Sequence, residues 1–202
     1  MNNICILDYG SGNVKSVVNA FSQFSRCSAS NETKDIINAS HLVLPGVGTY
    51  KDSMQRILNT IPIELVHEQI KAGKPILGIC VGMQVLGNVG IEFEQARGLE
   101  LLPGIVTKIE AGSLPLPHVG WNNLLELTNH PITSGISEDD DFYFVHSYAY
   151  SSIPSEYVNA QVHYGVNFPA IVSFENIIGV QFHPEKSQKS GNRLIQNFLG
   201  IK

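Results

Sequence analysis

The chain has 202 residues, 43% of them hydrophobic and 15% charged, with a formal net charge of −5. This length allows one domain with a substantial core, here residues 1–202, and the apolar runs are far too short to cross a membrane. The net negative charge gives no electrostatic reason to bind nucleic acid. The N-terminus does not read as a signal peptide and the cysteines are not spaced as disulfide pairs, so we expect a protein of the reducing cytoplasm.

Short apolar runs alternate with helical patterns in the first half of the chain. Buried strands are predicted at residues 4–7, 41–44 and 75–80, where apolar side chains run together between turn residues. Helices are predicted over residues 14–24, where apolar residues recur at helical spacing, and over residues 63–72, which stop at a glycine. Strand, helix and strand in this order predict right-handed βαβ units around a parallel sheet.

The second half is richer in strands, with turn residues between them. Strands are predicted over residues 142–145, 160–164, 170–174 and 178–182. The chain closes with an amphipathic helix, for which Ser190 is the expected N-cap. We therefore expect an α/β fold: a single domain with a mostly parallel central sheet flanked by helices, plus additional antiparallel strands.

Cys80 follows a predicted strand and stands between two glycines, Gly78 and Gly82. A free cysteine at a strand end is more often a packed side chain than a nucleophile. The Gly-x-Cys-x-Gly pattern, however, is the cysteine counterpart of the nucleophile elbow, where a strand turns so sharply into a helix that neighbouring side chains would collide. A helix that begins at Val81 would also favour the thiolate through its N–H groups and dipole. Cys80 is therefore a candidate nucleophile.

A thiol nucleophile needs a base, and the base needs a group that orients it. His183 ends a predicted strand and is followed by Pro184, which restricts the turn, and by Glu185. The ordinary alternative is a histidine at a strand end beside a glutamate in a surface salt bridge. Glu185 can instead accept a hydrogen bond from His183 and so select its tautomer. His183 and Glu185 are the candidate base and orienting carboxylate.

A glycine-rich loop, Pro-Gly-Val-Gly at residues 45–48, follows the strand predicted at residues 41–44. Taken alone, such a loop is most often an ordinary turn from a strand into a helix. Acyl transfer, however, needs backbone N–H groups that point at a developing oxyanion. This loop would supply one such group beside the elbow, and Val81 would supply a second.

Cofactor and metal signatures are weak. Gly10-Ser11-Gly12 lacks the third glycine of a dinucleotide fingerprint, and no phosphate-binding P-loop pattern occurs. His67-Glu68 lacks the second histidine of a zinc-binding helix, and the other histidines show no ligand spacing. We expect neither a cofactor nor a metal.

Three segments together resemble the class I (triad-type) glutamine amidotransferases: residues 45–48 (PGVG), 78–84 (GICVGMQ) and 181–187 (QFHPEKS). Further segments are similar to the glutaminase subunits of imidazole glycerol phosphate synthase, an enzyme of histidine biosynthesis: residues 8–13 (DYGSGN), 117–122 (PHVGWN) and 142–148 (FYFVHSY). The resemblance covers essentially the whole chain.

The resemblance implies a site and a partner. Cys80, His183 and Glu185 would form the catalytic triad, and Val47 and Val81 would supply the oxyanion N–H groups. The substrate, glutamine, would lie against a further set of residues: Gly46, Gly48, Gln84, Glu92, His146, Ser147 and Tyr148. The partner would be a (β/α)8 cyclase subunit that forms a heterodimer with this chain, receives its ammonia and faces Asn13, Trp121, Tyr143 and Lys186. No cofactor is implied for this chain.

Several alternatives share part of this pattern. Cysteine peptidases and thiol-based stress proteins use a similar elbow, but they give no reason for the other two motifs to occur with it. A vitamin B6-type glutaminase is disfavoured by residues 120–122 and 144–148. Residues 85–92 are richer in glycine than the family pattern predicts. Close paralogues that feed ammonia to the amidination of surface-polysaccharide sugars would share the glutaminase chemistry, because the acceptor site is on the partner.

Overall fold

A computed structural model describes residues 2–202 and has a seven-stranded central sheet. In sheet order its strands are β11 (Val158–Tyr164), β12 (Val166–Phe174), β13 (Ile177–Val180), β4 (Ile76–Ile79), β3 (His41–Leu44), β1 (Asn3–Leu7) and β2 (Arg26–Ser30). The five strands from β13 to β2 run parallel, and β12 and β11 extend the sheet with antiparallel strands. The predicted fold class is confirmed.

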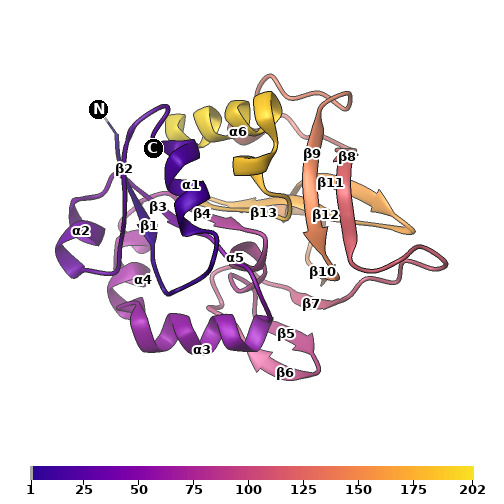
Figure 1. Ribbon diagram of the computed structural model, residues 1–202, viewed down its shortest axis with the longest axis horizontal. Helices are drawn as coiled ribbons and strands as arrows, with labels where there is room; N and C mark the ends of the chain where they lie inside the picture. The colour runs from indigo at the N-terminus through magenta and orange to yellow at the C-terminus, as the bar shows by residue number, and fades with distance from the viewer. Residues whose placement is uncertain (1) are drawn as a thin grey trace.

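Helices cover both faces of this sheet (Figure 1). One face carries α1 (Val14–Phe21) and α6 (Gln188–Gly200), and the opposite face carries α2 (Thr33–Asn38), α3 (Tyr50–Thr60) and α4 (Ile63–Lys71). Phe21 of α1 and Phe198 of α6 meet edge to face, with their ring centroids 6.3 Å apart. Because both faces are covered, every residue of β3, β4 and β13 is buried, which explains why these strands are continuous apolar runs.

Two smaller sheets complete the structure. The first is four-stranded, in the order β10 (Tyr148–Ser152), β7 (Ile105–Lys108), β5 (Val89–Glu92) and β6 (Glu94–Arg97). The second is an antiparallel pair, β8 (His118–Asn123) and β9 (Asp141–His146), at the end of the molecule opposite α2 (Figure 1). Three single turns of 3-10 helix are η1 (Pro131–Thr133), η2 (Ser155–Tyr157) and η3 (Pro184–Lys186).

Most strands predicted from apolar runs are present. Those predicted at residues 4–7, 41–44 and 75–80 are confirmed as β1, β3 and β4, and the helix at residues 63–72 is confirmed as α4. The first predicted helix ends earlier than expected, at Phe21, where the Phe24 N–H bonds to the Phe21 carbonyl and closes a turn. Helices α2 and α3 and strands β2, β5 to β8 and β10 were not predicted. Strands β5 to β7 have four residues each and carry both polar and exposed side chains, so their pattern is weak.

The expected N-cap of the last helix, Ser190, is wrong. Helix α6 begins at Gln188, and Ser190 lies in its first turn, where its hydroxyl donates to Asp140 at 3.1 Å. The residue before the helix, Ser187, makes no side-chain cap because its hydroxyl is used elsewhere. It donates to the His183 carbonyl at 2.7 Å and accepts from the Tyr143 N–H at 2.9 Å. The Ser187 hydroxyl thus does not cap α6 but instead holds the turn that contains His183.

Within residues 2–202 no helix is long and apolar enough to cross a lipid bilayer. No group of three or more His, Cys, Asp or Glu side chains in the same range is arranged to hold a metal ion.

Candidate active site

Three segments far apart in the sequence meet at the carboxyl edge of the central sheet. β3, β4 and β13 are parallel neighbours, and their register pairs Leu44 with Gly78 and Ile79 with Val180. The glycine-rich loop after β3, Cys80 after β4 and the His183 turn after β13 therefore leave the sheet side by side. Open α/β sheets bind their ligands at this edge.

Cys80 stands at the turn between β4 and the short helix α5 (Val81–Gln84). Its backbone has φ 55° and ψ −114°, outside the regions that L-residues normally occupy. A Cβ on Gly78 would lie 2.6 Å from the Gly82 carbonyl oxygen, and a Cβ on Gly82 would overlap the Leu44 carbonyl oxygen. Both glycines are therefore required by close packing, as expected for a nucleophile elbow. The Cys80 residue is only 3% exposed.

The glycine-rich loop packs against the first turn of α5. A Cβ on Gly46 would overlap the backbone of Val81 and Gly82, so this glycine allows the loop to approach the elbow closely. Gly48 has a different role, because it has φ 102° and nothing within 4 Å of its Cβ position. The Gly48 backbone conformation, rather than packing, requires glycine. The Val81 N–H begins α5 and has no partner within the helix.

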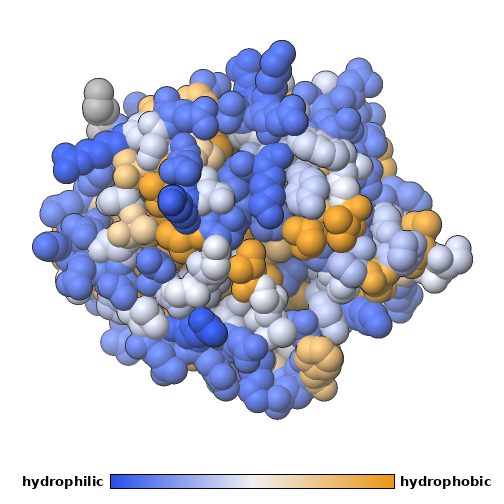
Figure 2. All heavy atoms as spheres, in the orientation of Figure 1, coloured by the Kyte–Doolittle hydropathy of each residue, from blue (hydrophilic) through white to orange (hydrophobic). Residues whose placement is uncertain are grey.

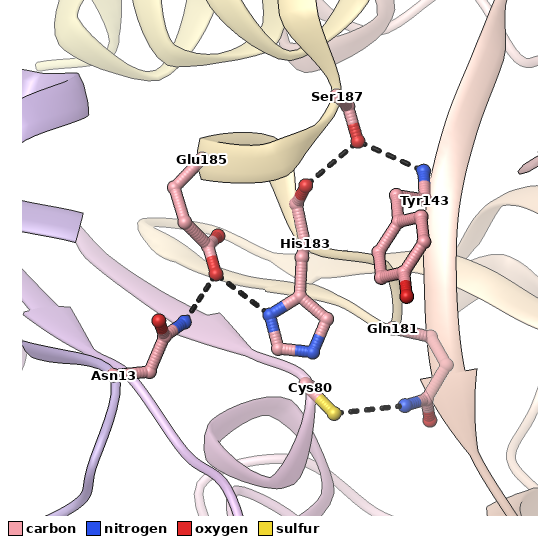
Figure 3. A network of polar contacts seen from close by, with 7 residues as sticks. All are labelled: Asn13, Cys80, Tyr143, Gln181, His183, Glu185 and Ser187. Carbon is pink, nitrogen blue, oxygen red and sulfur yellow. Dashed lines mark hydrogen bonds and ion pairs between the residues drawn. The ribbon is translucent and has the colours of Figure 1, made fainter. Parts of the chain in front are cut away.

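His183 and Glu185 form a buried pair. The His183 Nδ1 and the Glu185 Oε1 are 2.7 Å apart, and the two side chains are 1% and 0% exposed. Figure 3 shows the other ring nitrogen of His183, Nε2, turned toward the Cys80 sulfur. Among the described residues this nitrogen makes no close hydrogen bond. The structure thus brings together the three residues predicted as nucleophile, base and orienting carboxylate.

The charge state of His183 follows from its neighbours. Burial lowers the pKa of His183, but the adjacent Cys80 side chain and Glu185 carboxylate outweigh burial and raise this pKa to about 10. The imidazole therefore holds its proton at neutral pH. A protonated imidazole on Nε2 can stabilise a thiolate and later release its proton to a leaving group.

Gln181 was missed as a site residue. It is 0% exposed, and its Nε2 lies 3.8 Å from the Cys80 sulfur, to which it can donate. Its Oε1 accepts from the Gln84 Nε2 at 3.0 Å, and that nitrogen also donates to the Tyr148 carbonyl at 2.8 Å. The available signal was a polar residue directly after a wholly apolar strand, in the segment that carries His183.

A cavity of about 290 Å³ opens beside Cys80 and His183. Its wall contains all residues predicted to hold the substrate except Gly46: Gly48, Gln84, Glu92, His146, Ser147 and Tyr148. Val47, Val81 and Lys186 also line it. A larger cavity of about 720 Å³ lies between β7, β10, β11 and β12, but none of the three candidate catalytic residues lines it. The smaller cavity is therefore the candidate substrate site.

Two lining residues are held by contacts inside the protein. The Glu92 Oε2 accepts a hydrogen bond of 2.6 Å from the N–H of Tyr50, the first residue of α3. This carboxylate therefore also pairs with one of the free N–H groups at the start of that helix. His146 uses Nδ1 toward the Tyr148 carbonyl at 2.9 Å and Nε2 toward His118 at 3.2 Å. The two ring nitrogens of His146 are therefore occupied within the chain.

The residues predicted to face a partner divide into two groups. Trp121 and Tyr143 meet edge to face at 5.9 Å, and the Lys186 ammonium lies 5.6 Å from the Tyr143 ring centroid. Asn13 instead points inward, where its side-chain amide donates to the same Glu185 oxygen that bonds His183 (Figure 3). Figure 2 shows the molecule in the orientation of Figure 1, with apolar side chains across the middle of the visible face, over the region where α1, α5 and β9 converge.

Comparisons with known proteins agree with this geometry. Residues 5–201 match the family model described as "Glutamine amidotransferase class-I". The imidazole glycerol phosphate synthase subunit HisH of Photobacterium profundum is 43% identical over 97% of this chain and 96% of its own length. The corresponding subunit of Lactococcus lactis is also 43% identical, over 98% of both chains.

Solved structures support the fold. A crystal structure of a glutamine amidotransferase has a TM-score of 0.77 at 16% identity, covering 98% of this chain and 97% of its own. A structure of PurLQS from Thermotoga maritima has a TM-score of 0.76 at 20% identity, covering 99% of both chains. The chain belongs to the class-I glutamine amidotransferase family and, within it, to the relatives of imidazole glycerol phosphate synthase subunit HisH.

Proposed function

We propose that this chain is the glutaminase subunit of an imidazole glycerol phosphate synthase. It hydrolyses glutamine to glutamate and passes the ammonia to a (β/α)8 cyclase subunit, which makes imidazole glycerol phosphate and AICAR in histidine biosynthesis. The observation that carries the proposal is the elbow cysteine facing a buried His183–Glu185 pair at the wall of a small cavity. The subunit names of the relatives support the pathway and favour it over a sugar-modifying partner.

In the proposed mechanism, the Cys80 thiolate attacks the carboxamide carbon of glutamine. The N–H groups of Val47 and Val81 stabilise the oxyanion of the tetrahedral intermediate. As the C–N bond breaks, His183 gives the proton on Nε2 to the departing ammonia, and a γ-glutamyl thioester remains. Neutral His183 then takes a proton from water, which attacks the thioester and releases glutamate and the Cys80 thiolate. Glu185 orients the imidazole throughout.

The cavity wall matches the polarity of glutamine. Besides Gly46 and Gly48 of the glycine-rich loop, four residues offer polar groups to the amino-acid end of the substrate, Gln84, Glu92, Ser147 and Tyr148, whereas both ring nitrogens of the lining residue His146 are already bonded within the chain. The Glu92 carboxylate supplies negative charge for the substrate ammonium. Because hydrogen bonds and charges become stronger in a small cavity shielded from water, a few such groups can set specificity.

A heterodimer gives the released ammonia a destination. Ammonia in neutral water is mostly protonated and no longer nucleophilic, so a closed route to the partner has a chemical purpose. We assign the partner-facing surface to Trp121, Tyr143 and Lys186, on β8, β9 and η3, of which Lys186 lines the cavity, and to Asn13, which directly precedes α1 and whose side chain also bonds Glu185. A free-thiol nucleophile suits a reducing compartment, which supports a complex in the cytoplasm.

The first prediction tests this function through its regulation. The purified chain is expected to release glutamate from glutamine slowly, and the cyclase subunit with its acceptor substrate should accelerate release strongly. Gly48 gives the loop the freedom to turn the Val47 N–H toward the oxyanion, and losing one such donor costs on the order of 10²–10³ in rate. Gly48→Ala should therefore change the activation ratio more than it changes the KM for glutamine.

The control for this experiment is Gly73→Ala. Gly73 has φ 97° and open space around it, as Gly48 does, but it follows α4 away from the cavity. Its replacement should leave the activation ratio unchanged. Full glutaminase activity in the isolated wild-type chain would contradict the proposed regulation, and no activity in the assembled complex would contradict the proposed function.

The second prediction concerns Glu185→Gln. The amide oxygen can still accept from the His183 Nδ1, so orientation is partly kept and the loss in kcat/KM should be smaller than for removal of His183. Because the carboxylate helps to raise the pKa of His183, its neutral replacement should lower that pKa. The alkaline decline of kcat/KM, which reports loss of the imidazolium, should then begin at a lower pH than in the wild type. An unchanged pH profile would count against the assigned role.

A further inference from the structure

Two buried histidines of the β8–β9 ribbon have no role in the proposed mechanism. His118 and His146 are directly paired across the two strands and are 3% and 6% exposed. The His118 ring stacks on Phe144, with centroids 4.9 Å apart, and on Tyr164, with centroids 4.1 Å apart. These stacking contacts explain how the His118 ring packs, but a ring without nitrogens would stack equally well. They therefore do not explain why both rings place polar nitrogens in the interior.

The hydrogen bonds of the pair select one tautomer for each ring. A carbonyl oxygen can only accept, so His146 carries its proton on Nδ1, 2.9 Å from the Tyr148 oxygen. Its Nε2 must then accept, and His118 must donate from Nδ1 across 3.2 Å. The remaining nitrogen of His118 faces the Asn122 Nδ2, a donor, at 3.3 Å, and the same Nδ2 donates to the His163 carbonyl at 2.9 Å. The bonds that run from Asn122 through the two rings therefore all point in one direction, toward Tyr148.

The chain of hydrogen bonds continues from Tyr148 to the nucleophile. The Tyr148 carbonyl also accepts from Gln84, and the Gln84 nitrogen donates in turn to the Gln181 Oε1. Both hydrogens of the Gln84 amide are thereby used, which fixes its orientation and leaves its oxygen as an acceptor. The Gln181 amide is oriented as well, with its Nε2 rather than its oxygen toward the Cys80 sulfur.

The pair works only in its neutral form. If His146 gained a proton, two N–H groups would face each other across the 3.2 Å contact, and if His118 gained one, its Nε2–H would face the Asn122 amide donor at 3.3 Å. Burial holds the pKa of His118 down to about 4 and that of His146 down to about 3. Both rings are therefore uncharged at neutral pH, where His183 is charged.

We propose that His118 and His146 are positioning residues for glutamine binding. Their fixed tautomers hold the Tyr148 carbonyl, which in turn holds the Gln84 amide in the orientation that presents its oxygen to the substrate. The inference rests on the proposed glutaminase function and adds to it a specific path from the β8–β9 ribbon to the cavity. His118 acts through His146 and Tyr148 and touches neither the substrate nor the reacting atoms.

The test compares two replacements of His118 in the complex with the cyclase subunit. His118→Phe keeps a ring for stacking but removes both nitrogens, so the His146 Nε2 loses the N–H group that donates to it. His118→Asn loses the stacking but keeps an N–H close to the position of the lost Nδ1. Loss of one buried hydrogen bond predicts an increase of about tenfold in the KM for glutamine for His118→Phe, with kcat little changed. His118→Asn should keep a KM close to that of the wild type, even if its thermal unfolding midpoint is lower.

Control measurements separate this inference from the function on which it rests. His163→Phe replaces an exposed histidine of β11, whose side chain bonds only to Asn167 among the described residues, and should leave the KM unchanged. A wild-type complex that does not hydrolyse glutamine would overturn the proposed function. A wild-type complex that is active, with an unchanged KM in His118→Phe, would overturn this inference. Equal increases in KM for both His118 variants would also overturn it, because they would indicate a role in packing alone.

Discussion

Cys80→Ser is expected to abolish glutamine-dependent synthesis by the assembled complex and to leave ammonia-dependent synthesis nearly intact. Cys80 performs only the hydrolysis of glutamine, whereas ammonia added to the solution reaches the acceptor site on the partner without it. Members of a catalytic triad act as a unit, so a loss of about 10³-fold or more in glutamine-dependent kcat is expected. The measurement is the rate of product formation with glutamine and, separately, with ammonium salt at high pH.

The other two cysteines provide the matched controls. Cys5 lies in β1 and Cys27 in β2, and burial raises the pKa of both thiols to about 11, so neither forms a thiolate readily. Cys5→Ser and Cys27→Ser should change both rates little. If Cys80→Ser reduced the ammonia-dependent rate as much as the glutamine-dependent one, Cys80 would support the fold or the interface instead of the chemistry.

His183→Asn is expected to be nearly as damaging as the loss of Cys80, again by about 10³-fold in the glutamine-dependent rate. Asparagine has no group that can carry a proton between the leaving ammonia and the attacking water. In the wild type the pKa of His183 is raised to about 10, so the acid form is present at neutral pH and is lost as the pH rises toward 10. The wild-type rate should decline over that interval, and the residual rate of His183→Asn should not.

The comparison with Glu185→Gln makes the assignment of roles testable. The His183→Asn variant leaves Glu185 without its imidazole partner, whereas the Glu185→Gln variant keeps a titrating imidazole beside Cys80. The histidine variant should therefore be the slower of the two. The reverse order, measured as kcat/KM for glutamine on complexes of equal stability, would mean that the base and the orienting group are wrongly assigned.

Most of the parallel part of the fold, without the polar edge strand β2, and the three candidate catalytic residues could be predicted from local sequence. Strands such as 41–44 and 76–79 are buried on both faces, so they are continuous apolar runs and stand out in the chain. The elbow could be found because its geometry excludes side chains at Gly78 and Gly82, which leaves a visible pattern of glycines. His183 could be found because Pro184 and Glu185 directly follow it. Local sterics and short spacing determined these features.

The polar network around these residues was decided only by the tertiary structure. The register of β13 against β4 brings Gln181 to Cys80, and the position of α1 brings the Asn13 amide to Glu185. The pairing of β8 with β9 places His118 against His146, so that each ring satisfies the other. A buried donor or acceptor must find a partner wherever the fold provides one, at any distance along the chain. Local pattern therefore determined where the nucleophile stands, whereas packing between distant segments decided how the groups around it are oriented.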